Sequence, residues 1–427
     1  MPDMTDIGFL SLEDQRRIQT ARLREHVRYC HEHSPFYRAR KDCPADVSPD
    51  TLAEIPLTDK AVFAERNAEF LAVPRTQIAD IVFSSGTTGM PTPVMYTASD
   101  LTRLAEQEAR AFASNGVTPE DTALLTCTLD RCFVAGYAYC SGLQKLGASV
   151  IRNGISPLEN HVAVMRALSP TVIVGVPVFL RRLGHVLDGN ADACHVRRLI
   201  CIGEPLRDER MNPLPLARDL QRLFPNATAH STYASSEGVT PFCECEAGCG
   251  GHLHMDAAVL EIVDENGRPV QDGQQGEIVL TPLGVRGMPL LRFRTGDISF
   301  MMSEPCRCGR NSPRLGPIIG RRNQMMKING TSLYPSALFN ALDKMPGISQ
   351  SYVTVFSEDR LSDSVRVTVS VCEPALTADE ITRTLQAALR VKPQVSIEPE
   401  EAVSAVIYTR ASRKPIRFID KREGTCL

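Results

Sequence analysis

Apolar residues between 81 and 240 recur in short runs separated by longer stretches of helical periodicity. The runs read as strands: "IVF", "ALLTCTL", "SVIRN", "TVIVGV", "RRLICIG" and "ATAHSTY". The stretches between them predict helices at 99–114, 137–146, 157–168, 177–188 and 207–223. This alternation predicts a mostly parallel sheet with helices on its faces, and ligands of such sheets bind outside the carboxyl ends of the strands.

The periodicity changes after residue 256. From 256 to 320 apolar and polar positions alternate, with "DENG" and "QDGQQG" as turns, which predicts antiparallel strands. The last hundred residues mix short strands with one clear helix, 377–390, and predict a small α+β domain. We therefore expect an α/β protein with a large N-terminal domain, 1–320, that includes a β-rich subdomain, and a small C-terminal domain, 321–427.

Composition narrows the classes of partner. The 47 basic and 50 acidic residues give a net charge of −3, which does not favour nucleic acid or an anionic membrane. No apolar run reaches the length of a membrane span, and the acidic N-terminus lacks the apolar core of a secretory signal. The 14 cysteines then predict a reducing, cytoplasmic location rather than a disulfide scaffold.

The segment "SSGTTG" is the first candidate for chemistry. Glycines allow close backbone approach, and hydroxyls with free N–H groups can surround phosphate oxygens. It lacks the Gly-Lys-Ser/Thr ending of a Walker A loop, so by itself it is either a polar turn or a phosphate loop. We expect it at the carboxyl end of a strand, between strand and helix. Its residues are Ser84, Ser85, Gly86, Thr87, Thr88 and Gly89.

Three further segments carry suitable side chains. "STYASSEG" offers an aromatic ring, Tyr233, and a carboxylate, Glu237, which can hold Mg²⁺ beside phosphates. "RFRTGD" ends in Asp297, and an aspartate after a strand can accept hydrogen bonds from ribose hydroxyls. Near the C-terminus, "SRKPIRF" contains Lys414. Taken singly, each is equally a solvated loop residue.

The four segments, in this order, resemble the adenylate-forming superfamily of acyl-coenzyme A synthetases and adenylation domains. The resemblance is to the phenylacetate-CoA ligase branch, with its coenzyme F390 synthetase-like members, and runs over nearly the whole chain. The matching segments are "HSPFYR", "IPLTDK", "SSGTTGMPT", "GEPL", "TYASSE", "RTGD", "GRRNQMMKINGTSLYP" and "KPIRFIDKR".

The resemblance implies a two-step reaction. A carboxylate attacks the α-phosphate of ATP to give an acyl-adenylate and pyrophosphate, and a thiol, usually that of coenzyme A, then takes the acyl group. It also implies that the small domain rotates between the steps and carries the catalytic Lys414, and that Glu237 (with Mg²⁺) and Thr87 share in catalysis. The nucleotide-binding residues that it implies are Ser84, Ser85, Gly86, Thr87, Thr88, Gly89, Gly203, Glu204, Pro205, Tyr233, Ala234, Ser235, Ser236, Asp297 and Arg321.

Two positions depart from the pattern of the superfamily. Many relatives have a lysine where this chain has Met90, so a cation beside the triphosphate is lost or supplied from elsewhere. The hinge segment commonly carries acids after "GR", whereas this chain reads Arg322, Asn323 and Gln324. These departures bear on the reaction rate, and they leave open a nucleotide-binding relative that has lost turnover.

Five cysteines form two groups, in "CECEAGCGGHLHMD" and "CRCGR". Zinc prefers four sulfur or nitrogen ligands, often paired at short spacing from separate segments. The alternative is a scatter of reduced thiols. The expected zinc ligands are Cys245, His252, Cys306 and Cys308, with Cys249 and His254 as substitutes.

The resemblance places the acid between the "GYAYCSGL" helix and two loops, with Tyr137, Ala138, Gly203, Glu204 and Ala234 as lining residues. Packing of Tyr137 in the core is the alternative. An aryl or arylacetic acid is implied, with ATP and coenzyme A as the other substrates. A carrier-protein thiol, an amine or a cofactor hydroxyl could replace coenzyme A as the acceptor, and a homodimer is the default assembly.

Overall fold

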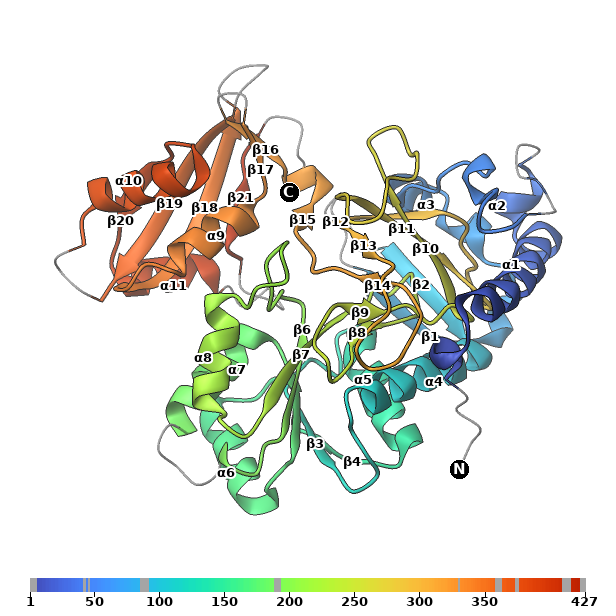
Figure 1. Cartoon of the computed structure of the whole chain (residues 1–427), viewed down its shortest axis with the longest axis horizontal. Helices are drawn as coiled ribbons and strands as arrows, with labels where there is room; N and C mark the ends of the chain where they lie inside the picture. Colours follow the sequence, from blue (N-terminus) through green and yellow to red (C-terminus); the bar gives the residue numbers. More distant parts are fainter. Residues whose placement is uncertain are drawn as a thin grey trace. The chain divides into compact units, whose positions relative to one another are not determined.

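The computed structural model describes residues 6–40, 44, 47–84, 92–187, 193–328, 331–357, 363–372, 376–408 and 416–422. Two compact units divide the described chain, the first ending at Ile318 and the second beginning at Ile319. Figure 1 traces the chain through both units.

The N-terminal part of the first unit is helical and ends in a hairpin. Its helices are α1 (Leu12–His33), α2 (Pro35–Arg38) and α3 (Lys60–Glu65). Ser11 caps α1 by accepting a hydrogen bond from the Asp14 N–H at 3.1 Å. The strands β1 (Ile78–Ser84) and β2 (Thr92–Thr97) then pair antiparallel. The expectation that residues 84–89 follow a strand of the parallel sheet is therefore wrong, because β1 and β2 form a sheet of their own.

A nine-stranded sheet forms the centre of the first unit, in the order β13-β14-β9-β8-β7-β6-β5-β3-β4. Strands β3 to β7 run parallel, as predicted, and β8, β9, β14 and β13 extend the sheet antiparallel. Their bounds are β3 Thr122–Leu125, β4 Ser149–Arg152, β5 Val172–Gly175, β6 Arg198–Ile202, β7 Thr228–Tyr233, β8 Phe242–Glu244, β9 Gly251–His252, β13 Met301–Met302 and β14 Arg314–Leu315.

Helices cover both faces of the parallel strands (Figure 1). On one face, α4 (Ala98–Ser114) and α5 (Val134–Leu146) enclose a core that contains Phe112, Tyr139 and Ile200. The opposite core lies under α6 (Leu158–Leu168), α7 (Pro177–Leu187) and α8 (Pro215–Leu223). The predicted helix 207–223 begins only at Pro215, because proline favours the first helical turn and Pro213 precedes it.

The β-rich part of the first unit contains the predicted antiparallel strands. They are β10 (Ala258–Val263), β11 (Gly276–Pro282) and β12 (Phe293–Ser299), and β11 pairs with both neighbours. All six residues of β10 are buried, because this sheet is packed on both faces.

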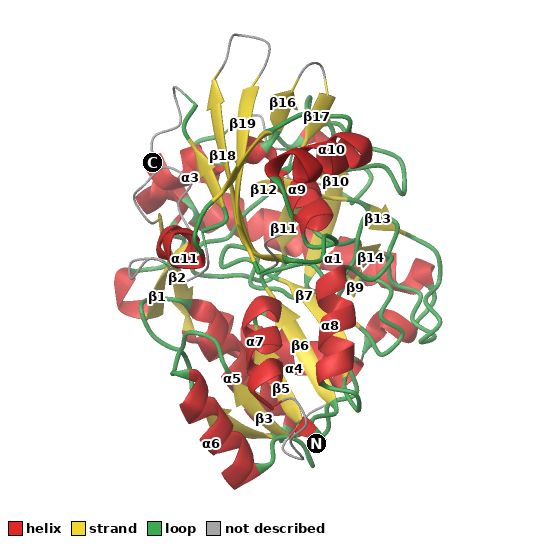
Figure 2. Cartoon of the chain, turned by 90° about the vertical axis from the view of Figure 1, so that its left-hand side faces the viewer, coloured by secondary structure: helices red, strands yellow, loops and turns green. Residues whose placement is uncertain are grey.

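The second unit is a small α+β structure (Figure 2). Its sheet has the order β20-β19-β18-β21, and α9, α10 and α11 accompany it. The predicted helix 377–390 is α10, which Thr377 and Glu380 cap reciprocally. Two other helices were not predicted. The bounds are β15 Gly320–Arg321, β16 Met326–Ile328, β17 Thr331–Leu333, α9 Pro335–Leu342, β18 Ile348–Ser357, β19 Asp363–Val371, α10 Ala378–Leu389, β20 Gln394–Ile397, α11 Glu400–Ile407 and β21 Phe418–Asp420.

None of the helices in the described ranges is both long and apolar enough to cross a membrane.

Candidate active site

Two predicted loops leave neighbouring strands at the carboxyl edge of the parallel sheet. Ile202 at the end of β6 pairs with Thr232 in β7. "GEPL" and "YASSE" therefore begin side by side, where ligands of such sheets bind. Gly203 turns the chain at the end of β6 with a φ of +76°, a conformation that favours glycine.

A hydrogen bond joins the residues predicted to hold adenine and ribose. The Tyr233 hydroxyl donates to Oδ2 of Asp297 at 2.9 Å, across 64 residues of sequence. Burial, followed by the charge of Asp297, raises the pKa of Tyr233 well above its ordinary value, so the phenol keeps its proton and remains the donor. The structure thus brings these two side chains together from β7 and β12.

The loop that carries Glu237 is fixed on both sides of that residue. The Tyr96 hydroxyl donates to the Ser236 carbonyl at 2.6 Å, and the Gly238 N–H donates to Oγ of Ser235 at 3.0 Å. On the other side, Arg103 of α4 donates to Oγ1 of Thr240 at 3.0 Å. Glu237 itself is buried, and these hydrogen bonds hold the backbone of the loop on both sides of it.

Tyr96 and Arg103 were missed by the sequence analysis. Both side chains donate hydrogen bonds to groups more than a hundred residues away along the chain. Most of the described acceptors of Arg103 are backbone carbonyl oxygens. Nothing in the local pattern of either residue signals such a contact. Since Tyr96 lies in β2, the strand that follows the glycine-rich segment also holds the loop of Glu237.

Of the glycine-rich segment, the structure describes Ser84 at the end of β1. Ser84 is buried and pairs with Thr92 across the hairpin. The Phe83 N–H donates to the Cys132 carbonyl at 2.9 Å, which ties β1 to the loop before α5. The other predicted residues of this segment, Ser85, Gly86, Thr87, Thr88 and Gly89, lie outside the described residues, as does Met90.

The residues predicted to line the acid pocket have different surroundings. Tyr137 on α5 is 42% exposed, whereas Ala138 is buried in the core. Ala234 is exposed at the end of β7. Oε2 of Glu204 accepts a hydrogen bond from the Val178 N–H at 3.1 Å, so this side chain satisfies a backbone donor in the first turn of α7.

Two predicted residues belong to the second unit. Arg321 lies in the short strand β15 and is half-buried. Lys414 lies outside the described residues. Both roles therefore stay predictions.

Four possible metal ligands converge on the antiparallel extension of the large sheet. The ligand atoms of Cys245, His252, Cys306 and Cys308 all lie within 4.8 Å of one another. Sγ of Cys245 is 3.6 Å from Sγ of Cys306, and Sγ of Cys308 is 3.5 Å from Nε2 of His252. These are the four residues that the sequence favoured.

Two similar turns present the cysteines. The Gly248 N–H donates to the Cys245 carbonyl and the Gly309 N–H to the Cys306 carbonyl, each at 2.9 Å. Both glycines have positive φ, +60° and +89°, which lets the chain fold back after each cysteine. The short C-x-C spacing is thus accommodated within a tight turn.

A neighbouring hydroxyl orients the His252 imidazole, and the alternative ligands His254 and Cys249 have other partners. Nδ1 of His252 lies 3.1 Å from Oγ of Ser312, which leaves Nε2 for the cluster. Burial and the charges of Arg310 and Arg314 lower the pKa of His252 to about 3, so the ring is neutral, as a ligand must be. His254 contacts Gln107 instead at 2.8 Å, and the Cys249 thiol lies 3.1 Å from the Ala247 carbonyl.

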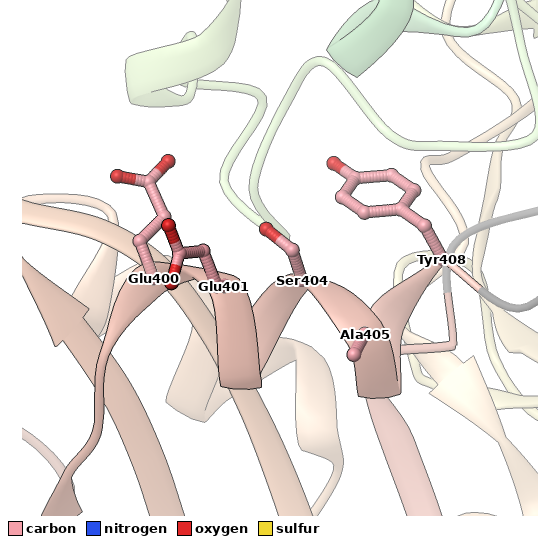
Figure 3. Close-up of a pocket in the computed structure, with 5 residues that line it drawn as sticks. All are labelled: Glu400, Glu401, Ser404, Ala405 and Tyr408. Carbon is pink, nitrogen blue, oxygen red and sulfur yellow. The ribbon is translucent and has the colours of Figure 1, made fainter.

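A hollow on the second unit contains no predicted site residue. It is lined by residues of α11 and its end, Glu400, Glu401, Ser404, Ala405 and Tyr408 (Figure 3). Ser404 donates to Gln350 at 2.9 Å and so helps to attach α11 to β18.

The model of the AMP-binding enzyme family matches residues 23–285, and that of the AMP-binding enzyme C-terminal domain matches 330–422. The chain belongs to the AMP-binding enzyme family. Among curated relatives, the phenylacetate-coenzyme A ligase of Thermus thermophilus is 31% identical over 86% of this chain and 84% of its own length. That of Escherichia coli is 29% identical over 96% of each. The predicted membership of the adenylate-forming superfamily, in its phenylacetate-CoA ligase-like branch, is confirmed.

Solved structures of this family share the fold. A 2-hydroxyisobutyryl-CoA ligase in the postadenylation state, in complex with 2-HIB-AMP, has a TM-score of 0.85 and 22% identity, and covers 97% of this chain and 91% of its own. ATP-bound MatB from Rhodopseudomonas palustris has a TM-score of 0.61 over 81% of this chain and 68% of its own. The predicted adenylate-forming fold is confirmed.

Proposed function

We propose that this AMP-binding enzyme activates a carboxylic acid with ATP, releases pyrophosphate, and transfers the acyl group from the acyl-adenylate to coenzyme A. The hydrogen bond between Tyr233 and Asp297 supports the proposal, because it joins the side chains that the resemblance assigns to adenine and to ribose. The curated relatives that cover most of the chain are phenylacetate-coenzyme A ligases, which favours an aryl or arylacetic acid.

The residues divide the chemistry between them. Tyr233 contacts adenine, Asp297 accepts hydrogen bonds from ribose hydroxyls, and the buried Glu237 is the residue that would hold Mg²⁺. A divalent cation there neutralises phosphate charge. The segment Ser84–Gly89 surrounds the triphosphate, and Lys414 stabilises the negative charge that develops between the carboxylate and the α-phosphate.

Exchange of labelled pyrophosphate into ATP, dependent on a carboxylic acid, tests the first step. We expect exchange with a phenylacetate-type acid, and thioester formation when coenzyme A is added. Exchange without thioester would point to another acceptor, such as a carrier-protein thiol. No exchange with any acid of the panel would contradict the proposal.

Lys414→Ala provides a residue-level test of the same reaction. We expect acyl-adenylate formation to fall by roughly 10²-fold or more, because a cation aimed at developing charge is lost, while ATP binding changes little. Lys392→Ala is the control, since Lys392 is an exposed lysine of the same unit. Equal rates in the two variants would remove Lys414 from the mechanism.

We also propose that Cys245, His252, Cys306 and Cys308 bind a structural zinc ion. Three sulfurs and one nitrogen on preformed turns suit tetrahedral zinc, and a closed set of four leaves no position for a substrate. Elemental analysis should find about one zinc per chain. Cys308→Ser should lose it and Cys249→Ser should keep it. Less than about half an equivalent in the parent protein would contradict the site.

Cytoplasmic location and a homodimer remain predictions. Sedimentation of the purified chain tests the second.

A further inference from the structure

One buried acid of the first unit has no place in the chemistry described so far. Glu108, on α4, is 3% exposed. Within the described residues it makes no hydrogen bond and no ion pair. Other acids of the same helix are used: Asp100 accepts the Arg286 N–H at 2.7 Å, and Glu106 pairs with Lys145 at 3.2 Å. A buried carboxyl without a partner costs about 1–3 kcal/mol, so its retention calls for a reason.

Helix α5 passes closely over the backbone and Cβ of Glu108. A Cβ atom added to Gly142 would lie 2.4 Å from Cβ of Glu108, so a glycine at this position lets the two helices meet there. Tyr137, which is predicted to line the acid pocket, lies on the same helix as Gly142. Glu108 is therefore at the contact between α4 and the helix proposed to contact the acid.

The groups near Glu108 are uncharged, and two of them, Cys127 and Tyr139, belong to the hydrophobic core under α4 and α5. The charge of Glu108 contributes to the raised pKa values of Cys127, Tyr139 and Cys243, which places it near all three groups. Cys127 follows β3 by two residues, at the carboxyl edge of the sheet. The part of the chain that the structure describes supplies no cation in this group.

The neighbouring strands add further polar atoms to the same layer. Cys243 pairs with Thr232 across β7 and β8, and Asn115 at the end of α4 donates to Sγ of Cys243 at 2.9 Å. The side-chain oxygen of Asn115 is buried without a hydrogen-bond partner among the described residues, whereas the Thr232 hydroxyl is a hydrogen-bond partner of the Cys243 thiol. Thr232 immediately precedes Tyr233 in β7, so the side chains of these two residues lie on opposite faces of the sheet.

We propose that Glu108 is a specificity-determining residue that binds a hydroxyl or amino substituent on the carboxylic acid. The inference rests on the proposed function and names the class of its substrate: an aryl acid with a hydrogen-bond donor away from its carboxylate. Such a group supplies the partner that the carboxyl lacks in the protein. An acid with only hydrocarbon at that end leaves Glu108 buried and unpaired, and is rejected for that reason.

Burial favours the protonated form of the Glu108 carboxyl, which can both donate and accept a hydrogen bond. It raises the pKa of the carboxyl to about 8, so the group is mostly protonated at neutral pH. A protonated carboxyl both donates and accepts a hydrogen bond, which matches a hydroxyl or a neutral aromatic amine equally well.

The test compares acids in the pyrophosphate-exchange reaction of the full chain. Phenylacetate, 3- and 4-hydroxyphenylacetate and 4-aminophenylacetate are measured with the parent protein, Glu108→Leu, Glu108→Gln and Glu106→Gln. We expect the parent to prefer a hydroxylated or aminated acid over phenylacetate by about tenfold or more in kcat/KM. Comparison of the hydroxyl and amino arms decides which substituent is bound.

The variants separate recognition from a structural role. Glu108→Leu should lose the preference by accelerating exchange with phenylacetate relative to the substituted acids, while Glu108→Gln, which still donates and accepts, should keep part of it. Glu106→Gln lies on the same helix in a surface ion pair and should leave the ratio unchanged.

Three outcomes would overturn the inference. In the first, the parent shows no preference for any substituted acid although it exchanges with phenylacetate. In the second, folded Glu108→Leu and Glu108→Gln both keep the parent ratio. In the third, no acid supports exchange, which removes the proposed function as well and is thereby distinguished from the first two.

Discussion

Two glutamates of the first unit are buried in different ways. Glu261, on β10, meets Arg292 through two parallel hydrogen bonds, Nε to Oε2 at 3.0 Å and NH2 to Oε1 at 2.9 Å. Glu108, between α4 and α5, meets no charged group among the described residues. Both carboxyls have a pKa raised first by burial, but Arg292 opposes that rise at Glu261. A buried acid with a complete set of partners belongs to the fold, whereas one without them is available to a ligand.

Arg292 has backbone partners in addition to Glu261. Its guanidinium also donates to the carbonyls of Ala53 at 3.0 Å, Ile55 at 2.7 Å and Gly267 at 3.2 Å. Its φ of +44° is uncommon for a residue with a side chain, and these contacts hold it there. One side chain thus joins the segment before α3 to the β-rich part, directly before the strand that carries Asp297.

The largest predicted effect comes from removing the ion pair between Glu261 and Arg292. Arg292→Leu should lower the free energy of unfolding of the first unit by about 3–5 kcal/mol, because Glu261 is left charged, buried and unpaired. Urea denaturation measures the change. Adding Glu261→Leu to this variant should restore part of the loss, since it removes the stranded charge. A loss of stability below about 1 kcal/mol would show that the ion pair of Glu261 with Arg292 contributes little, and so does not distinguish Glu261 from Glu108.

Glu108→Gln should have the opposite effect, with a defined pH dependence. Burial raises the pKa of Glu108 in the folded state to about 8, above its ordinary value of 4.5. Between these two values the folded state holds a proton that the unfolded state has lost, so this group makes stability fall as pH rises. The neutral amide removes that dependence, and the variant should gain about 1–3 kcal/mol on the parent between pH 5.5 and pH 8.

Denaturation curves at several pH values measure this gain, with Glu106→Gln as the matched control. A gain that is the same at pH 5.5 and pH 8 would show that Glu108 does not change its proton affinity on folding.

Tyr233→Phe should have the smallest effect on free energy. It tests Asp297, an acid that has a neutral hydroxyl as a side-chain partner, whereas Glu261 has an arginine. The neutral Tyr233 hydroxyl donates a hydrogen bond to Asp297, so the loss of this bond should cost about 0.5–1.5 kcal/mol. We expect this as a few-fold rise in KM for ATP, with little change in KM for the acid. A change confined to the acid would place Tyr233 elsewhere than at adenine.

The features that could be predicted from the sequence are those that depend on residues close together along the chain. Hydrophobic periodicity located α4, α6, α7 and α10 to within a residue or two. The four cysteine and histidine ligands that converge were also predicted, because their spacing in two short segments is itself local information.

What the sequence could not predict depends on contacts between distant residues. The strand pairing that makes β1 and β2 a separate hairpin is one case. The use of Glu204 to satisfy the first turn of α7 is another, since the carboxylate within "GEPL" is equally suited to contact a ligand. Glu108 lies in an ordinary amphipathic helix pattern, and its burial depends on the packing of α5 against α4 at Gly142, a contact between distant residues.

The paired turns at Cys245 and Cys306 also bear on how the chain reaches its native state. A metal held by these turns and His252 would close residues 253–305 into a loop, and that loop contains β10, β11, β12 and Asp297. Closing a loop of this length in advance removes entropy from the unfolded chain. The order of synthesis matters in turn, because Cys245 and His252 leave the ribosome well before Cys306 and Cys308. The supply of metal during synthesis would then set the yield of protein with a folded β-rich part, although none of the four candidate metal ligands is among the residues proposed to bind the nucleotide.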